Sequence, residues 1–397
     1  MAKSGKKKAT PKKGLSDAAR AFGELVRLYR FQQPQSSKRA DLTNFTFWAG
    51  AGFSKSWDSR APVGNQLFTL KQKSLEDVLD FSVLERMLGL DGDLTSDDLR
   101  QLVYQLDMYE KYPDVCSRYI DPQNIQIVRA GLRAAVMNRY EEIAPINYRD
   151  KDTRKFLAPS PTVQQKAIIE FFDLLRRCSD GSNFFAEGIR FNFATTNYDY
   201  VIETILDNIV GLDDSHHLYT YRGFTPSEIV DFSPRITTHQ HWLVDHLLKL
   251  NGGFEILRTG ERYLLDYGER THAQIIEQPP VLMLASREQD YTDPYFRTIF
   301  PKAVRLMRDS RVLILVGYSL PDDDALMRFI IRQFAEEPED GKGKYLFYVD
   351  LLDKPTKLAK LKSVFPSIGS YSVPRVFTFE GSFADFAVEC LEDLSRR

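Results

Sequence analysis

Short clusters of glycine, asparagine, serine and aspartate follow several apolar runs of this sequence, and the first of them is "GAGFS". The apolar run 43–49 ends at Gly50, Ala51 and Gly52, and Ser54 follows two residues later. Glycines after a strand let the backbone approach a phosphate closely, and the N-terminus of the next helix offers free N–H groups and a positive dipole end. These four residues could therefore hold the diphosphate of a nucleotide. The same pattern also suits a tight turn from a strand into a loop.

The later clusters occupy the same position, directly after apolar runs with the length and composition of buried strands. In a parallel sheet the carboxyl ends of the strands lie along one edge, where open α/β folds bind their ligands. The clusters together therefore indicate a dinucleotide site. They are Thr196, Asn197 and Asp199 after the second run, Asn251 and Gly252 after the third, Gly317 and Ser319 after the run 311–316, and Asp350 after the run 344–349.

The elements that carry these clusters are apolar strands separated by helices. Continuous apolar strands between helices are typical of a parallel sheet that is covered on both faces. The sequence therefore predicts an α/β fold, a Rossmann-like doubly wound parallel sheet.

A long helical stretch interrupts this alternation. Over about residues 71–188, apolar positions recur among charged ones at helical spacing, most clearly in 163–177, which we interpret as part of an inserted helical module. The predicted organisation is a basic disordered tail and an N-terminal helix over 1–40, followed by a nucleotide-binding domain over 41–397 that contains the insertion.

Composition narrows the classes of function. The chain has 397 residues and a net charge of -2, so nothing draws it as a whole toward nucleic acid or an anionic membrane. Six lysines lie in the first fourteen residues without an aromatic residue among them, so we interpret this stretch as a solubilising tail. The alternative is an electrostatic contact with nucleic acid. We expect no direct nucleic-acid binding. We also expect no membrane span, because no run of about 18 apolar residues occurs.

Cysteine usage points to a reducing compartment. The three cysteines, Cys116, Cys178 and Cys390, lie far apart, so this chain cannot build a four-cysteine zinc site. A disulfide framework is not expected either, which fits the cytoplasm.

The motifs "GAGFS", "TTNYD", "KLNGG" and "GYSLPDDD" resemble those of the sirtuin-like superfamily, in order and spacing, over about residues 43–350. "GYSLPDDD" is similar to the prokaryotic branch, whose members are NAD-consuming proteins of anti-phage defence. The resemblance implies a Rossmann-like fold and NAD as the ligand. It places the diphosphate at Gly50, Ala51, Gly52 and Ser54, the adenosine half at Gly317 and Ser319, and a ribose hydroxyl at Asp350.

Two departures from the family pattern shape the expected chemistry. Without the zinc module of the protein deacylases, the resemblance implies NAD hydrolysis with no zinc rather than removal of acyl groups from lysine. Where the family has histidine, this chain has Asn251. The nicotinamide of NAD is already cationic and leaves without a proton, so the protein must mainly orient the ribose and a water. Asn197 and Asn251 can bind these groups through their amides. Asp199 can hold the strand tip or act near the developing cation.

The general base of the reaction could also be a histidine that lies upstream of Asn251 in the sequence. His246 is the histidine nearest to Asn251 within its strand, and the alternative is that it packs in the fold.

The function expected from these motifs is an NAD+ glycohydrolase that releases nicotinamide and ADP-ribose in anti-phage defence by abortive infection. A permanently active enzyme of this kind would deplete its own cell, so we expect control by homo-oligomer assembly or by a partner such as a HerA-type ATPase. The chain has no P-loop, so any ATPase must be a separate protein. The alternatives are a sensor that binds NAD or ADP-ribose without turnover, and a structural subunit of a defence complex.

Overall fold

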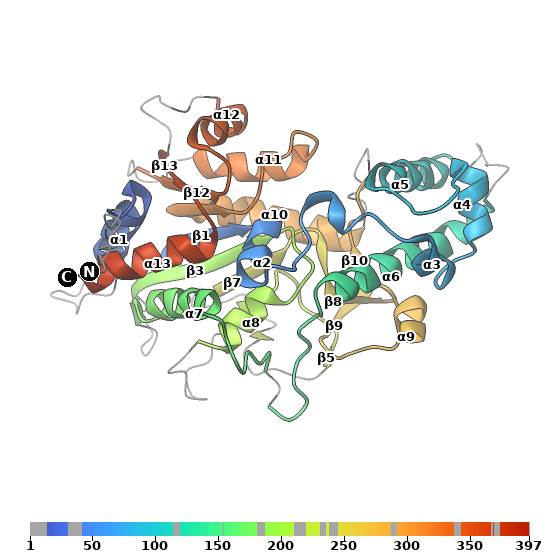
Figure 1. Cartoon of the computed structure of the whole chain (residues 1–397), viewed down its shortest axis with the longest axis horizontal. Coiled ribbons are helices and arrows are strands. Elements are labelled where there is room, and N and C mark those ends of the chain that lie inside the picture. The colour runs from blue at the N-terminus through green and yellow to red at the C-terminus, as the bar shows by residue number, and fades with distance from the viewer. Residues whose placement is uncertain are drawn as a thin grey trace, which may run out of the picture.

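The core of the fold is a parallel sheet built from the apolar runs of the sequence (Figure 1). All pairs in it are parallel except that of the short β2 (Ser179–Asp180) with β3. The strand order is β13 (Arg375–Glu380), β12 (Tyr345–Asp350), β11 (Val312–Val316), β1 (Leu42–Ala49), β3 (Glu187–Thr195), β7 (Asp245–Lys249), β4 (Thr220–Tyr221) and β6 (Ile236–Thr237). This computed structural model describes residues 14–30, 42–113, 120–153, 155–180, 187–209, 220–230, 236–237, 245–286, 291, 293–336, 343–366, 368 and 374–396.

The strand order reverses at β1. The chain passes from β1 to β3 and β7 on one side, and then returns to β11, β12 and β13 on the other side. The register aligns the last residues of neighbouring strands, so that Val316, Ala49, Thr195 and Lys249 form one row across the sheet. The residues that follow these strands therefore meet at one edge, at the point where a doubly wound sheet binds ligands.

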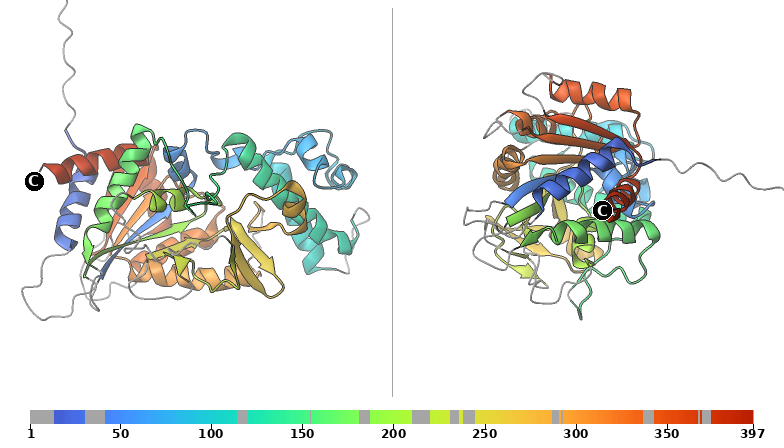
Figure 2. Two further views of the ribbon diagram at one scale, coloured as in Figure 1. Left: turned by 90° about the horizontal axis from the view of Figure 1, so that it is seen from below. Right: turned by 90° about the vertical axis from the view of Figure 1, so that its left-hand side faces the viewer.

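Helices cover both faces of the sheet, which confirms the predicted doubly wound α/β fold. In Figure 2 (left), the blue, green and red helices lie on one side of the sheet and the orange helices on the other. Alternation along β1 explains this, because Phe45 and Phe47 face one core and Trp48 faces the other. The first core includes α1 (Asp17–Tyr29), α2 (Ala51–Trp57), α7 (Val163–Arg176), α8 (Val201–Asp207) and α13 (Phe383–Ser395). The second includes α10 (Pro294–Asp309), α11 (Ala325–Arg332), η3 (Gln333–Ala335) and α12 (Lys354–Val364).

A second, smaller sheet was not expected from the sequence. Its order is β10 (Pro280–Leu282), β8 (Gly252–Thr259), β9 (Arg262–Asp266) and β5 (Ile229–Val230). It lies beside α9 (His272–Glu277) and the helices of the predicted insertion (Figure 1). These are α3 (Gln72–Glu76), α4 (Phe81–Leu88), α5 (Ser96–Lys111) and α6 (Ile125–Ile143), with the short turns η1 (Gly64–Gln66) and η2 (Pro122–Asn124). We call α3 to α6 the helical module.

The stretch predicted as one insertion thus contains two differently placed parts. The helical module packs beside the small sheet, whereas α7 packs against α13 and α2 on the main sheet. The start of α7 follows from local sequence. The hydroxyl of Thr162 accepts the Gln165 N–H, and the Gln165 side chain accepts the Thr162 N–H in return.

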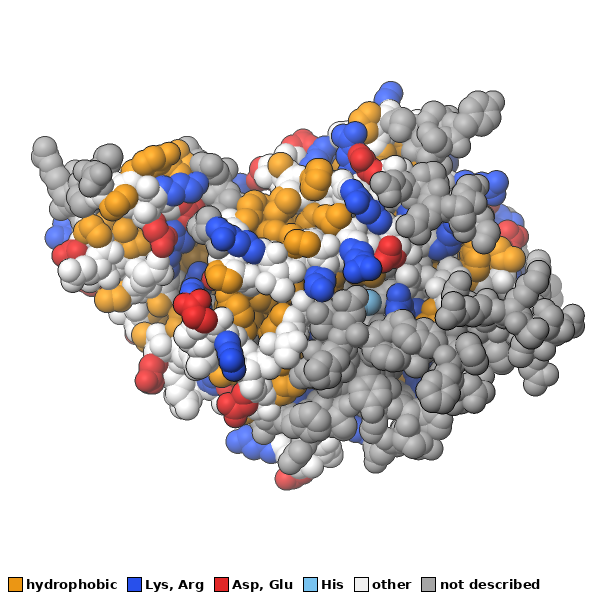
Figure 3. Space-filling view, turned by 180° about the vertical axis from the view of Figure 1, so that it is seen from behind, with side chains coloured by type: hydrophobic (Ala, Val, Ile, Leu, Met, Phe, Trp, Pro, Cys, Tyr) orange, Lys and Arg blue, Asp and Glu red, His pale blue; other side chains and the backbone are white. Residues whose placement is uncertain are grey.

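None of the helices in the described part of the chain is long and apolar enough to cross a bilayer. On the face shown in Figure 3, basic and acidic side chains are interspersed among hydrophobic ones, in agreement with the small net charge of -2.

Candidate nucleotide site

The glycines of "GAGFS" lie where the loop after β1 touches the loop after β11. The Gly52 N–H donates to the Gly317 carbonyl at 2.9 Å. A Cβ on Gly50 would lie 2.5 Å from that carbonyl oxygen, and a Cβ on Gly52 would lie 2.6 Å from the Gly317 Cα. Gly317 itself has a φ of +56°, and its Cβ would lie 2.4 Å from Gly52. The protein's own backbone therefore requires glycine at all three positions.

Most of the N–H groups that the sequence predicts for a diphosphate already donate hydrogen bonds within the protein. The N–H groups of Gly50, Gly52 and Phe53 donate to the carbonyls of Val316, Gly317 and Gly50. Among residues 50–53, Ala51 is the one whose N–H has no acceptor in the described part of the chain. The tight-turn interpretation thus accounts for the glycines, and diphosphate binding at this turn stays a prediction.

Ser54, Asn197 and Asp199 form one hydrogen-bonded network beneath the turn. The Ser54 hydroxyl is buried and donates to Asp199 Oδ2 at 2.7 Å. The Asn197 amide nitrogen donates to Ser54 Oγ and to the Gly50 carbonyl, both at 2.8 Å. The network therefore fixes the end of β3 against the end of β1. The Asn197 amide oxygen makes no hydrogen bond within the described residues, so this oxygen is available to a ligand.

Asp199 is held by donors from three elements. Besides Ser54, the Tyr140 hydroxyl of α6 donates to it at 3.1 Å and the Val201 N–H at the start of α8 at 3.0 Å. Burial raises the pKa of Asp199, while the hydrogen bonds from Ser54 and Val201 act in the opposite direction. Of the two roles expected for Asp199, this geometry favours holding the strand tip.

Asn251 presents an unsatisfied oxygen at the same edge. It lies in the turn between β7 and β8, where its backbone carbonyl accepts the Met283 N–H at 2.8 Å. Its side-chain Oδ1 is buried and has no hydrogen-bond partner in the described part of the chain. Leaving a buried acceptor unpaired costs about 1–3 kcal/mol, and a ligand that donates a hydrogen bond would recover it. A ribose hydroxyl has the chemistry that fits this oxygen.

Gly252, next to Asn251, is required by the small sheet. It has a φ of +85°, and a Cβ there would lie 1.9 Å from the Val281 carbonyl oxygen of β10. The space beside this glycine therefore belongs to β10. A ligand contact at Gly252 stays a prediction.

The remaining predicted residues lie along the same edge of the sheet and make fewer hydrogen bonds than the residues described above. Thr196 is half-buried, and its N–H donates to the Ala49 carbonyl at 3.3 Å. Ser319 is exposed. Asp350 is half-buried at the tip of β12, where its Oδ1 accepts the Leu352 N–H at 2.9 Å. All three reach the edge, and their contacts with a nucleotide stay predictions.

His246 is not brought to this edge. It lies inside β7, three residues before Lys249 and so about 10 Å from the edge. Its Nδ1 contacts Asn192 Oδ1 at 3.0 Å, and burial lowers its pKa to about 4. The ring is therefore buried and neutral, as expected for a packing histidine, and we leave it out of the proposed site.

Four buried charges beneath the edge were missed by sequence reasoning. The Lys249 ammonium lies 2.8 Å from Glu203 Oε1 of α8 and 3.0 Å from Glu255 Oε1 of β8, and it donates to the Asp199 carbonyl at 2.7 Å. Arg222 pairs with Glu203 at 3.1 Å. This cluster of Lys249, Glu203, Glu255 and Arg222 joins the ends of β3 and β7 to α8 and the small sheet. A lysine inside the apolar run "LLKL" was the signal that could have revealed it.

A cavity of about 380 Å³ opens beside Asp199, a volume that suits a small ligand. Tyr140, Asp58 and Arg60 contribute to its lining. Asp58 and Arg60 pair at 2.8 Å, and the hydrogen bond from Arg60 lowers the pKa of Asp58. The site thus has charged groups close by that the motifs did not indicate.

The described residues contain no group of three or more His, Cys, Asp or Glu side chains that could hold a metal ion. The expectation of a zinc-free site stays a prediction.

Comparison with known proteins identifies a class of domain. The family model described as "SIR2-like domain" matches residues 192–363, which run from β3 to α12 and contain Asn197, Asn251 and Gly317. This part of the chain is therefore similar to SIR2-like domains, and the fold observed here is Rossmann-like. The match covers less than half of the chain and does not include the "GAGFS" turn.

Solved structures of Sir2 enzymes align along most of the chain. One, from work on the mechanism and regulation of Sir2 enzymes, is 12% identical, covers 96% of this chain and 98% of its own, and has a TM-score of 0.40. Another, a Sir2 with a p53 peptide and NAD+, is 12% identical, covers 95% and 98%, and has a TM-score of 0.37. At these values the likeness adds no argument to the family match. No curated protein matches the chain.

Proposed function

We propose that this protein is an NAD+ glycohydrolase. It would hydrolyse the bond between nicotinamide and ribose, so that NAD+ and water give nicotinamide, ADP-ribose and a proton. The observation that carries the proposal is the buried, unpaired Oδ1 of Asn251 at the carboxyl edge of a SIR2-like domain. A polar oxygen without a partner at the carboxyl edge of a doubly wound sheet calls for a ligand with hydroxyl groups.

The chain's residues would act by positioning. Nicotinamide leaves as a neutral molecule from a cationic group, so no protein acid is needed. The Asn197 oxygen can accept a hydrogen bond from the attacking water or from a ribose hydroxyl, while its nitrogen stays fixed on Gly50 and Ser54. Asn251 would accept from a second hydroxyl. Asp199 would hold the ends of β3 and α8 in place.

A defence role with control by assembly or a partner belongs to the same proposal. It is supported by the resemblance of "GYSLPDDD" to the prokaryotic branch and by the harm that unregulated NAD+ loss would cause. We propose a homo-oligomer in the cytoplasm that a HerA-type ATPase or similar protein activates. Removal of acyl groups from lysine is not part of the proposal, because the chain has only three cysteines and cannot build the zinc module of deacylases.

Two observations favour a second candidate, a sensor that binds NAD+ or ADP-ribose without turnover. His246 lies about 10 Å from the edge, and the Asp199 carboxylate is occupied by three donors. Neither of these side chains is therefore placed to take a proton from water at Asn251.

The test is incubation of the purified chain with NAD+, alone and with its genomic neighbour, followed by chromatography of nicotinamide and ADP-ribose. We expect Asn197→Ala to abolish turnover, Asn251→Ala to lower it about ten- to hundred-fold, and Asn251→His to be tolerated. Asn65→Ala, at an exposed asparagine outside the site, is the matched control. Intact, bound NAD+ without products would favour the sensor. Failure to bind NAD+ would overturn the glycohydrolase, and failure to bind either NAD+ or ADP-ribose would overturn both candidates.

A further inference from the structure

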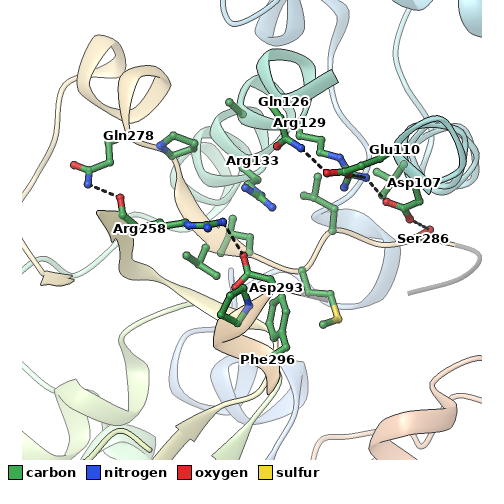
Figure 4. Close-up of a pocket in the computed structure, with 18 of the residues that line it drawn as sticks. Asp107, Glu110, Gln126, Arg129, Arg133, Arg258, Gln278, Ser286, Asp293 and Phe296 are labelled. Carbon is green, nitrogen blue, oxygen red and sulfur yellow. Dashed lines mark hydrogen bonds and ion pairs between the residues drawn. The ribbon is translucent and has the colours of Figure 1, made fainter. Parts of the chain in front are cut away.

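A cavity of about 640 Å³ lies between the helical module and the small sheet. Residues of α5 and α6 line one side, and residues of β8, β10 and the start of α10 line the other (Figure 4). The volume lies in the range of small-molecule sites. None of the lining residues belongs to the candidate nucleotide site.

Three arginines reach this cavity, and they differ in how they are neutralised. Arg129 pairs with Asp107 and, at 3.1 Å, with Glu110. Arg258 lies 3.9 Å from Asp293. Two of the three thus have a carboxylate partner within the protein.

Arg133 is the exception. Figure 4 shows it between Arg129 and Arg258, pointing into the cavity. It forms no hydrogen bond or ion pair in the described part of the chain, and its Nε is buried without an acceptor. Burial, followed by the like charge of Arg129, lowers the pKa of Arg133, while the negative charges of Asp293 and Glu110 act in the opposite direction; a guanidinium stays charged in proteins. The Arg133 side chain is half-buried, and neither carboxylate pairs with it directly, so its guanidinium N–H groups remain open to a ligand that carries a negative charge.

The rest of the lining indicates the shape of the ligand. Val103, Leu282 and Phe296 give the cavity an apolar wall. Four carboxylate residues line the cavity beside the three arginines, namely Asp107, Glu110, Glu277 and Asp293. They make the cavity unfavourable for a strongly anionic molecule, because like charges close together repel each other.

We propose that this cavity binds a small organic anion. One acidic group, a phosphate or a carboxylate, would pair with the Arg133 guanidinium, whose planar fork can donate two parallel hydrogen bonds to either group. An apolar or aromatic body would lie against Val103, Leu282 and Phe296. The proposal does not depend on NAD+ hydrolysis.

The test is calorimetric titration of the full chain with three matched compounds: 1-naphthyl phosphate, 1-naphthoate and neutral 1-naphthol. We expect at least one of the two anions to bind with a Kd of about 1 mM or tighter, and naphthol to bind at least about tenfold more weakly. The anion that binds tells a phosphate site from a carboxylate site. Excess NAD+ should not displace it, because the two sites share no residue.

Arg133→Gln should weaken anion binding at least about tenfold. Because Arg133 makes no hydrogen bond within the described residues, the variant should not melt below the wild type when no anion is present. Arg133→Lys, which keeps the charge but loses the fork, should bind with intermediate affinity. Arg139→Gln is the matched control on the same helix, where the guanidinium pairs with Glu142 at 3.0 Å. The proposal fails if neither anion binds, if naphthol binds equally well, if Arg133→Gln binds like the wild type, or if NAD+ competes.

Discussion

Lys249→Met should destabilise the protein strongly, because Lys249 is the central cation of the buried charge cluster. Its ammonium contacts Glu203, Glu255 and the Asp199 carbonyl within 3.0 Å. The native cluster has two acids and two bases. The variant would leave two buried glutamates facing Arg222 alone. Removing one member of a buried, hydrogen-bonded ion pair typically costs about 3–5 kcal/mol.

The loss should also depend on pH. Burial alone would raise the pKa of Glu203, but Lys249 and Arg222 hold it below its usual value. Burial raises the pKa of Glu255 despite Lys249. Without the lysine, the pKa of Glu255 should rise further, so the folded variant binds a proton more readily than the unfolded chain does. Stability lost at alkaline pH should then be partly regained as the pH falls.

The assay is urea unfolding of Lys249→Met and the wild type at about pH 8 and about pH 5. The difference in unfolding free energy should be smaller at the lower pH. The double variant Lys249→Met/Glu255→Gln, which restores neutrality, should recover part of the loss, and the exposed Lys354→Met should change stability by less than about 0.5 kcal/mol. A loss below about 1 kcal/mol at pH 8, or one that the double variant leaves unchanged, would refute the assigned role of the cluster.

Three further changes test the edge of the sheet and the strand beneath it. Gly317→Ala should lower the free energy of unfolding in urea by about 3 kcal/mol or more, because the φ of Gly317 is +56° and its Cβ would lie 2.4 Å from Gly52. An unchanged free energy of unfolding would contradict the contact between the two loops. Ser54→Ala should cost about 1.5–3 kcal/mol by the same assay, because Asp199 loses a donor, and an unchanged midpoint would contradict the network. His246 has its pKa lowered to about 4, so the folded state binds fewer protons than the unfolded chain and stability falls as the pH drops below about 6.5. His246→Gln should remove roughly 2–3 kcal/mol of this fall between about pH 7 and pH 4, and an unchanged pH profile would show that the ring does not titrate this way.

The main sheet could be predicted because each of its longer strands carries a local signal. Residues 311–316 and 344–349 are short apolar runs between helices, and such runs become parallel strands whose ends share an edge. The small sheet could not be predicted in the same way. Its longest strand, β8, begins in the glycines of "LNGG", which end the preceding apolar run and look like a turn.

The sequence could predict at which edge of the sheet the site lies, but no finer detail of the site. The motifs indicate which residues follow strands, and the register aligns those strand ends. They do not indicate which polar groups the protein uses internally. Gly52 and Gly317 meet across 265 residues of chain, and Ser54 and Asp199 across 145. Such contacts depend on the whole sheet, so a residue typical of ligand binding can equally be a fixed part of the scaffold.

Helix α6 of the helical module is an example of how the candidate nucleotide site depends on distant parts of the fold. Tyr140 near the end of α6 donates to Asp199 at the candidate nucleotide site, whereas Arg129 and Arg133, two to three turns earlier on the same helix, line the larger cavity. Asn138, between them, contacts His272 of α9 beside the small sheet. A rigid helix fixed at both places keeps Tyr140 in position, because its displacement would remove one of the three donors to Asp199. The module is therefore part of the structure that holds the ends of β1 and β3, although it lies outside the matched SIR2-like domain.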